Sequence, residues 1–306
     1  MRDLDLTSLR LFVAACDHRN IARAGAQAHL GASAVSKRLA QLEAAVGAPL
    51  LVRQRRGVVP TAAGEMLLEH ARALLAASDR LGRDMADHGR GIKGQVRVLA
   101  TLSAIAEFLP DDIAAFLQDP AHAGIRIDLA EGPTSELARA VREGLAPLGI
   151  GWDAADLAGL QTRPYRSDHL AIVAHPAHPI AARSHCAFVE TLGHEHVGLP
   201  ASTAVYTLLA RAAAVAGRPL NYRAVVSTFD ASLRCVRAGL GIAVVPREVA
   251  APMAGDGAFR VVPLTDAWAR RRFTVCFKDE AGLSPSARLL LAHLERAGRA
   301  HPAEPA

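Results

Sequence analysis

In the first part of the chain, apolar residues recur at helical spacing. A first helix is predicted over residues 7–18, where apolar side chains follow the spacing i, i+3, i+4, i+7. Asn20 is a good N-cap for a second helix over residues 21–30, and Gly31 suits a left-handed turn at its end. A third helix is predicted from Ser33 to Gly47. Two short helices joined in this way form a helix-turn-helix.

A short hairpin and a long helix are predicted next. Residues 50–53 and 58–59 flank the segment Gln54-Arg55-Arg56-Gly57, which indicates a β-hairpin wing with an arginine-rich tip. Thr61 is a suitable N-cap for a helix that runs to about residue 88. One face of this helix has the spacing of a coiled-coil seam, formed by Leu67, Ala71, Leu74, Ser78, Leu81 and Met85.

From residue 95 onward, short apolar runs alternate with helical patterns. Strands are predicted over residues 96–100, 125–130, 148–152, 170–174, 196–199, 224–227, 242–245, 260–262 and 273–277. Helices are predicted over residues 105–118, 134–143, 203–216, 230–238 and 284–298. This order is typical of an α/β domain with mainly parallel sheets.

Composition and charge narrow the class of protein. The 306 residues are 51% hydrophobic and 21% charged, which excludes a disordered chain and favours about two domains. Residues 1–64 hold nine Lys/Arg against four Asp/Glu, whereas the rest of the chain is balanced. Such asymmetry is expected when one domain binds nucleic acid. Since neither a membrane span nor a secretion signal is found, we expect a cytoplasmic protein.

The N-terminal motifs resemble those of the LysR-type transcriptional regulators. They keep that family's order and spacing in Leu9-x-x-Phe12, Ala22-Arg23-Ala24-Gly25, Ala34-Val35-Ser36-Lys37-Arg38-Leu39, Gln41-Leu42-Glu43, Val46-Gly47-x-x-Leu50-Leu51-x-Arg53 and Pro60-Thr61-x-x-Gly64. Ala32-Ser33 stands where the family commonly has Gln-Pro. The resemblance implies an α/β protein with an all-α winged helix-turn-helix at 1–64, a dimerisation helix and hinge at 65–94, and a periplasmic-binding-protein-like effector domain at 95–306.

The expected DNA contacts follow from how a recognition helix enters the major groove. Its N-terminal end would bring Ser33, Ser36 and Lys37 to the base edges of double-stranded promoter DNA, with Arg38 and Gln41 near the backbone. The phosphates would be bound by Arg53, Arg55 and Arg56. For each of these side chains the alternative is simple solvation. Because the family dimerises through the long helix, the resemblance implies a homodimer or homotetramer on a palindromic site.

The effector domain is expected to have two Rossmann-like lobes, as the resemblance implies. Lobe I would comprise 95–164 and 269–306, and lobe II 165–268. Ligands bind such sheets at the carboxyl ends of strands, where helix N-termini present free N–H groups. The hydroxyl side chains expected there are Thr101, Ser103, Thr134, Ser202, Thr203 and Thr228. Helix capping is the alternative for each, and the absence of Lys or Arg from these segments favours a small polar or anionic effector.

Other chemistry is not indicated. His194-Glu195-His196 lacks a third ligand and places neighbours on opposite faces of a strand, so no metal site is predicted. No nucleophile motif or nucleotide fingerprint is found, so we predict neither a catalytic residue nor a cofactor. The four cysteines are too far apart for a disulfide framework, and a thiol switch at Cys186 or Cys235 stays open.

The sequence therefore predicts a transcriptional regulator rather than an enzyme. In the family it resembles, a small molecule between the lobes changes the packing of dimers, and with it DNA bending or access of RNA polymerase. One alternative is a solute-binding module that does not regulate DNA, which leaves the basic N-terminal part unexplained. Another is an α/β enzyme, which needs a catalytic cluster that the sequence does not contain.

Overall fold

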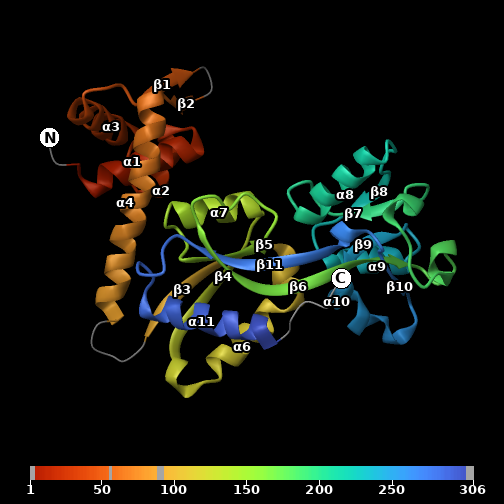
Figure 1. The fold of residues 1–306 in the computed structure, drawn as a ribbon. Coiled ribbons are helices and arrows are strands. Elements are labelled where there is room, and N and C mark those ends of the chain that lie inside the picture. The colour runs from red at the N-terminus through yellow and green to blue at the C-terminus, as the bar shows by residue number, and fades with distance from the viewer. Residues whose placement is uncertain (1–3, 55–56, 88–92, 301–306) are drawn as a thin grey trace. The chain divides into compact units, whose positions relative to one another are not determined.

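The computed structural model describes residues 4–54, 57–87 and 93–300. The chain divides into two compact units, residues 1–88 with 143–145 and residues 89–142 with 146–306 (Figure 1). None of the helices in the described ranges is long and apolar enough to cross a membrane.

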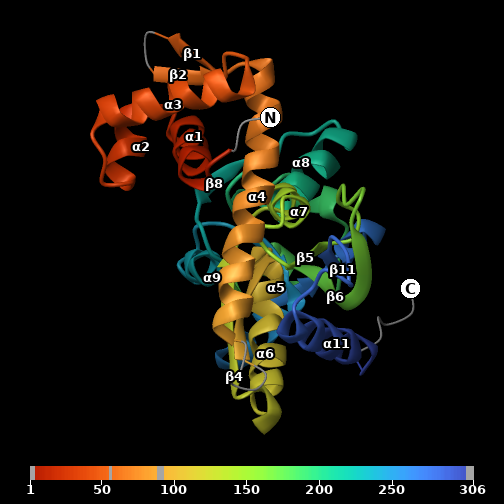
Figure 2. The same ribbon diagram turned by 90° about the vertical axis from the view of Figure 1, so that its left-hand side faces the viewer.

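The first unit is a small helical domain with a hairpin. Its helices are α1 (Leu6–His18), α2 (Ile21–Gln27), α3 (Ala32–Val46) and α4 (Ala62–Asp87), the last a single long helix (Figure 2). α1, α3 and the start of α4 share one core, which includes Phe12, Leu39 and Leu68. The predicted helix-turn-helix is confirmed, since α2 and α3 are joined by four residues.

The helix caps and turns of this unit agree with those predicted from the sequence, with one exception. The Asn20 side chain accepts two backbone N–H groups from the first turn of α2, and Gly47 ends α3 with φ 79°, so both predictions are confirmed. The prediction of a left-handed Gly31 is wrong. Gly31 has φ −67° and caps α3, and its carbonyl accepts the N–H of Ala34 at 3.0 Å. Because α2 ends earlier than predicted, the left-handed residue is His29, with φ 54°.

The wing is an antiparallel hairpin of β1 (Leu51–Gln54) and β2 (Gly57–Pro60), as predicted. Gly57 has φ 128°, and a Cβ there would lie 2.0 Å from the carbonyl oxygen of Arg19, so this position requires glycine. That same oxygen accepts the N–H of Val58 at 3.0 Å and ties the wing to the turn after α1. The wing tip residues Arg55 and Arg56 lie outside the described residues.

The second unit has the predicted alternation of strands and helices. Its strands are β3 (Lys93–Ala100), β4 (Gly124–Glu131), β5 (Leu148–Trp152), β6 (Gln161–Ala174), β7 (His196–Gly198), β8 (Tyr222–Val225), β9 (Ala243–Pro246), β10 (Arg260–Pro263) and β11 (Arg270–Phe277). Its helices are α5 (Leu102–Glu107), α6 (Leu109–Leu117), α7 (Thr134–Arg142), α8 (Ala204–Val215), α9 (Phe229–Arg237), α10 (Arg247–Ala250) and α11 (Pro285–Ala300). The α/β fold class is confirmed.

The pairing of these strands is mixed, so the prediction of mainly parallel sheets is wrong. β3 pairs in parallel with β4 and β5, and β7 with β8. By contrast, β6 is antiparallel to β9, β10 and β11, and β11 is antiparallel to β5. The short apolar runs that predict strands do not reveal their direction.

The predicted helix over 105–118 is two helices. Phe108 has φ −146° and ψ −25° and separates α5 from α6. Pro110 follows in the first turn of α6, where its missing N–H costs no hydrogen bond. The break lets α5 start at Leu102, directly after β3.

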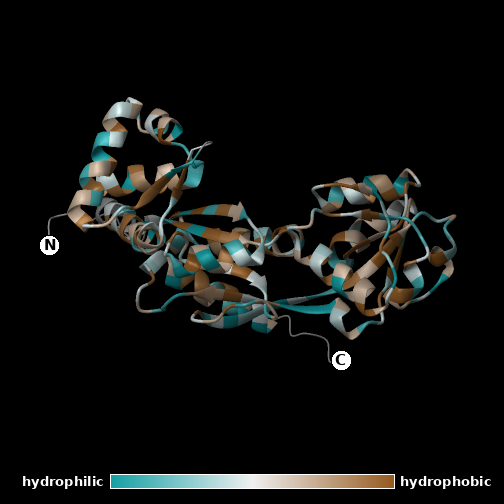
Figure 3. Cartoon of the chain, turned by 90° about the horizontal axis from the view of Figure 1, so that it is seen from above, coloured by the Kyte–Doolittle hydropathy of each residue, from teal (hydrophilic) through white to brown (hydrophobic). Residues whose placement is uncertain are grey.

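Two hydrophobic cores lie along the long strand β6. One contains β3, β5, β11 and α11 residues such as Val98 and Leu290, and the other contains β9, α8 and α9 residues such as Val244 and Leu233. β6 contributes Tyr165 to the first core and Leu170 to the second. The strands that build these cores are largely apolar (brown in Figure 3). β6 therefore passes from one part of the unit to the other.

Candidate functional site

The outward face of α3 carries most of the predicted DNA contacts. The opposite side of α3 is buried in the core of the first unit. A helix turns about 100° per residue, so Ser33, Ser36, Lys37 and Gln41 all project on the side away from this core. Ser33, Lys37 and Gln41 are exposed, and Ser36 is half-buried. These side chains are thus free to contact a molecule that binds against α3.

Arg38 points toward its own unit. Its Nη1 atom lies 3.4 Å from Oδ1 of Asp5, the residue that caps α1. Hydrogen bonds from Ser8 lower the pKa of Asp5, and the charge of Arg38 lowers it further. Within the described part of the chain, Lys37 and Arg53 form no ion pair and are exposed. Lys37 and Arg53 are therefore better placed than Arg38 to meet an external anion.

Glu43 connects α3 to the wing, a role that the sequence did not reveal. Its Oε1 atom accepts the backbone N–H groups of Leu50 and Leu51, at 2.7 and 3.1 Å. Glu43 was part of a family motif, but its spacing alone does not say which groups it would bind. The bond fixes the start of the wing relative to the recognition helix.

Glu43→Ala is expected to lower the free energy of unfolding of the first unit by about 1–3 kcal/mol, because two half-buried N–H groups lose their acceptor. The measurement is urea denaturation followed by far-UV circular dichroism. Glu43→Gln keeps an oxygen acceptor and is the matched control, with a smaller expected loss. Equal losses in the two variants would show that these hydrogen bonds do not matter.

The predicted seam of α4 divides into two parts. Ala71 is fully buried in the core of the first unit and Leu67 packs against that core, so the prediction that Ala71 faces a partner is wrong. The core of the first unit is larger than expected because the start of α4 packs onto it. Farther along, Leu74 and Leu81 are 50% and 62% exposed, and Ser78 is partly exposed. The side chain of Met85 lies outside the described residues.

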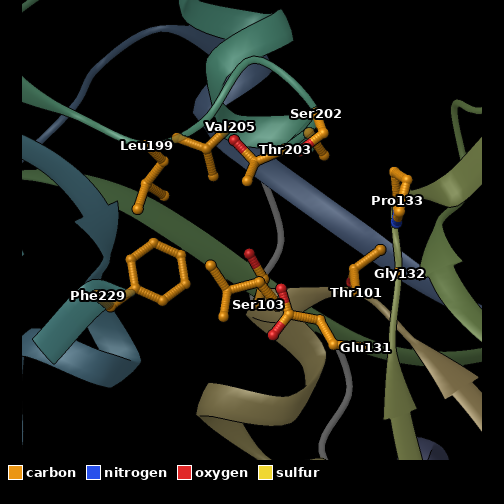
Figure 4. A pocket seen from close by; sticks show the side chains of 12 residues that line it. Thr101, Ser103, Glu131, Gly132, Pro133, Leu199, Ser202, Thr203, Val205 and Phe229 are labelled. Atoms are coloured by element: carbon orange, nitrogen blue, oxygen red, sulfur yellow. The ribbon is translucent and has the colours of Figure 1, made fainter. Parts of the chain in front are cut away.

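The second unit contains a cavity where several of the predicted effector residues meet (Figure 4). It has a volume of about 400 Å³, part of it open to solvent. Four of the six predicted residues line it: Thr101, Ser103, Ser202 and Thr203. They come from two parts of the unit, the first pair from the start of α5 and the second from the segment before α8. Leu102, Leu199, Val205 and Phe229 add an apolar wall.

Thr134 and Thr228 are not among the residues that line this cavity. Thr228 caps α9, and its Oγ1 accepts the N–H of Ala231 at 3.2 Å, so the capping explanation holds there. Thr134 lies beside Gly151, where a Cβ would be 3.1 Å from the Thr134 methyl carbon. Their chain neighbours, Pro133 and Phe229, are the residues that line the cavity.

The hydroxyls that line the cavity differ in the hydrogen bonds that they form within the protein. Thr203 caps α8, since its Oγ1 accepts the N–H of Tyr206 at 3.2 Å, and it also donates to the carbonyl of Pro200 at 2.8 Å. Thr101 is only 6% exposed, and its Oγ1 has no hydrogen-bond partner within the described chain. A buried hydroxyl without a partner is costly, so a ligand that bonds to Thr101 would gain from it.

The cavity has no basic side chain among its described lining residues, but it has one acidic side chain, Glu131. In Figure 4 the Glu131 carboxylate is directed toward Ser103. Helices α5 and α8 begin at the cavity and present backbone N–H groups, which favour negative charge. The site thus offers hydroxyls and helix N-termini, as predicted, together with a carboxylate that was not.

A buried arginine bonds to one of the lining residues. Arg271 is 1% exposed, and its Nε atom donates to Oδ1 of Asp168 at 2.9 Å while Nη2 donates to Oδ2. Nη2 also donates to Oγ of Ser103 at 3.1 Å. Arg271 was missed because it stands between two other arginines, a run that suggests a solvated surface. The alternation of a strand was the available signal, since both neighbours are exposed.

Two of the residues considered for metal or redox chemistry, His196 and Cys186, are engaged within the fold. The ring nitrogens of His196 lie 3.2 Å from Oγ1 of Thr191 and 3.1 Å from the carbonyl of His194, and burial lowers the pKa of His196 to about 4. Cys186 is buried, which raises the pKa of its thiol and makes the reactive thiolate scarce.

Comparison with known proteins gives the family. Residues 6–65 match the family of bacterial regulatory helix-turn-helix proteins of the lysR type, and residues 89–299 match the LysR substrate binding domain. The chain is 26% identical to the HTH-type transcriptional regulator GbpR of Azospirillum brasilense, over 96% of this chain and 86% of that protein. It is 30% identical to the regulator TfdS of Cupriavidus pinatubonensis, over 81% and 84% of the two chains.

Solved structures of the same fold include CbnR, described as a LysR family transcriptional regulator. The TM-score is 0.69 at 21% sequence identity, covering 96% of this chain and 99% of that one. Full-length CbnR in complex with its target DNA gives a TM-score of 0.67, also at 21% identity, covering 96% and 100%. Since both family models match and together span most of the sequence, the chain belongs to the LysR family of transcriptional regulators and is not an enzyme.

Proposed function

We propose that this protein binds palindromic promoter DNA as a homo-oligomer. The observation that carries the proposal is the outward face of α3, where Ser33, Lys37 and Gln41 are exposed, as is Arg53 of the wing. Lys37 donates to guanine and Arg53 to a phosphate in this arrangement. Ser36 contributes little base discrimination, because a hydroxyl pairs with donors and acceptors alike. The complex of CbnR with its target DNA has the same fold.

The oligomer forms through the exposed part of α4. Leu74 and Leu81 are large apolar side chains with half or more of their surface exposed, seven residues apart on one helix. A spacing of seven places both on one seam that a second copy covers.

The effector is a small polar or anionic molecule in the cavity that Thr101, Ser103, Ser202 and Thr203 line. We place lobe I at 95–164 and 269–306 and lobe II at 165–268, so that the cavity lies between the lobes. The two cores joined by β6 support a division into two lobes, although Tyr165 packs in the first core and Ala269 in the second. Binding shifts the lobes, changes the packing of subunits and alters DNA bending or the access of RNA polymerase.

The salt dependence of DNA binding tests the proposal. Each phosphate contact steepens the slope of log K against log salt by about 0.9, so the affinity of the full chain should fall steeply with salt. Arg53→Ala should reduce that slope by about one unit. The control is Arg10→Ala, because Arg10 is paired with Asp79 at 3.0 Å and should leave the slope unchanged. A flat salt dependence would contradict DNA binding by this unit.

A further inference from the structure

Three elements of the second unit bring acidic side chains to the neighbourhood of Arg271, and two of these side chains are fully buried. Asp168 on β6 and Glu107 on α5 both have fully buried side chains, and Arg271 on β11 is the cation between them. Glu248 on α10 is near enough that oxygens of the three carboxyl groups lie within 4.8 Å of one another. Arg271 therefore faces more carboxylates than it can neutralise.

Glu107 is the unsatisfied member of this group. Its Oε1 atom lies 3.7 Å from Nη2 of Arg271, beyond hydrogen-bond distance, and neither of its oxygens has a hydrogen-bond partner within the described chain. A buried carboxylate without donors is strongly disfavoured, whereas the neutral acid is not. Burial raises the pKa of Glu107 well above its ordinary value, and the charge of Asp168 raises it further, while the charge of Arg271 opposes both. A hydrogen bond that the protonated Glu107 donates to Asp168 also favours the acid form.

The same nitrogen of Arg271 donates to a residue that lines the effector cavity. Nη2 carries two hydrogens, and it uses them on Oδ2 of Asp168 and on Oγ of Ser103, the second at 3.1 Å. Ser103 lines the cavity and stands four residues before Glu107, one turn away on α5. An ionised Glu107 would compete with Ser103 for the second hydrogen of Nη2.

We propose that Glu107 is a proton-controlled switch acting on Ser103 through the positioning residue Arg271. With a proton on Glu107, Arg271 donates to Ser103, and the Ser103 hydroxyl keeps its own hydrogen for a ligand. When Glu107 releases its proton to water, Arg271 turns to the new carboxylate and Ser103 loses its donor. This inference rests on the proposed effector site, and it makes the response to effector stronger at lower pH.

Other charged groups face this cluster. Glu248 accepts the backbone N–H of His169 at 3.3 Å, and burial raises the pKa of Glu248, while Arg247 lowers it. Glu248 is an exposed residue, whereas the side chain of Glu107 is fully buried. Comparison of a Glu107 variant with the wild type therefore distinguishes the titration of Glu107 from that of Glu248.

The test uses the full chain without DNA or effector. Both tryptophans of the chain are near the cluster in sequence or pairing: Trp268 is three residues before Arg271, and Trp152 pairs with Phe273 of β11. Tryptophan fluorescence is followed as the pH rises from about 4.5, near the ordinary pKa of glutamate, to about 8.5. We expect a transition in the wild type that is lost in Glu107→Gln, whose spectrum resembles that of the wild type at low pH.

Glu131→Gln is the matched control, because it removes a carboxylate from the cavity but not from the cluster, and it should keep the transition. Superimposable titrations of wild type and Glu107→Gln, or a wild type without a transition, would overturn the proposal. If Glu107→Gln does not fold, infrared spectroscopy of the wild type decides instead. A protonated carboxylic acid band should remain above about pH 4.5, the ordinary pKa of glutamate, and disappear as the pH rises through the transition. The absence of such a band over that whole range would also overturn the proposal. Neither measurement depends on DNA binding, so it can fail independently of the proposed function.

Discussion

Arg271→Met is expected to lower the free energy of unfolding of the second unit by about 3–5 kcal/mol, the cost of removing one partner from a buried ion pair. The substitution leaves the fully buried carboxylate of Asp168 without its cation and Ser103 without its donor. Urea denaturation followed by tryptophan fluorescence measures this free energy of unfolding, because Trp152 and Trp268 both belong to the second unit.

The neighbouring arginine supplies the control for that substitution. Arg272 is 77% exposed and its Nε lies 2.9 Å from Oδ2 of Asp153, so Arg272→Met should cost less than about 1 kcal/mol. A loss of similar size in both variants would mean that burial of Arg271 does not determine the stability of the cluster.

Gly64→Ala is expected to destabilise the first unit by about 3 kcal/mol, at the upper end of the usual cost of overpacking. A Cβ at Gly64 would lie 2.1 Å from the carbonyl oxygen of Leu50, a backbone atom at the start of the wing, and 3.1 Å from Pro60. Backbone atoms cannot turn aside as a side chain does, so either the wing or the first turn of α4 must move. The loss should appear in a far-UV circular dichroism transition that tryptophan fluorescence does not report.

Gly82→Ala in the same helix is the matched control. A Cβ at Gly82 would meet nothing within 4 Å, and alanine is the better helix former by about 1 kcal/mol. We therefore expect a small gain in stability from Gly82→Ala and a large loss from Gly64→Ala. Changes of the same sign would contradict the close approach of α4 to the wing.

Much of the fold could be predicted from the sequence because local patterns determine it. The cap at Asn20, the turn at Gly47 and the hairpin after α3 depend on residues within a few positions of each other. Gly31 shows the limit of prediction from local sequence patterns. A glycine beside a predicted helix end suggests a left-handed turn, yet the end of α2 shifted, and His29 took that conformation.

The part of the candidate site that could not be predicted depends on contacts distant in sequence. Thr101 and Ser103 meet Ser202 and Thr203 only because the two parts of the second unit fold together. Asp168 and Arg271 are 103 residues apart, and nothing in either local pattern points to the other. The buried Ala71 likewise required knowledge of how much of α4 the core of the first unit covers.

The proposed function requires that the outward face of α3 reads a specific DNA sequence. The measurement is a footprint of the full chain on the DNA upstream of its own gene, with Lys37→Ala beside the wild type and Arg10→Ala as a control. We expect the wild type and the control to protect a palindrome, and Lys37→Ala to lose about 1–3 kcal/mol of discrimination there. Equal, sequence-independent protection by all three proteins would contradict the claim and leave only a basic surface.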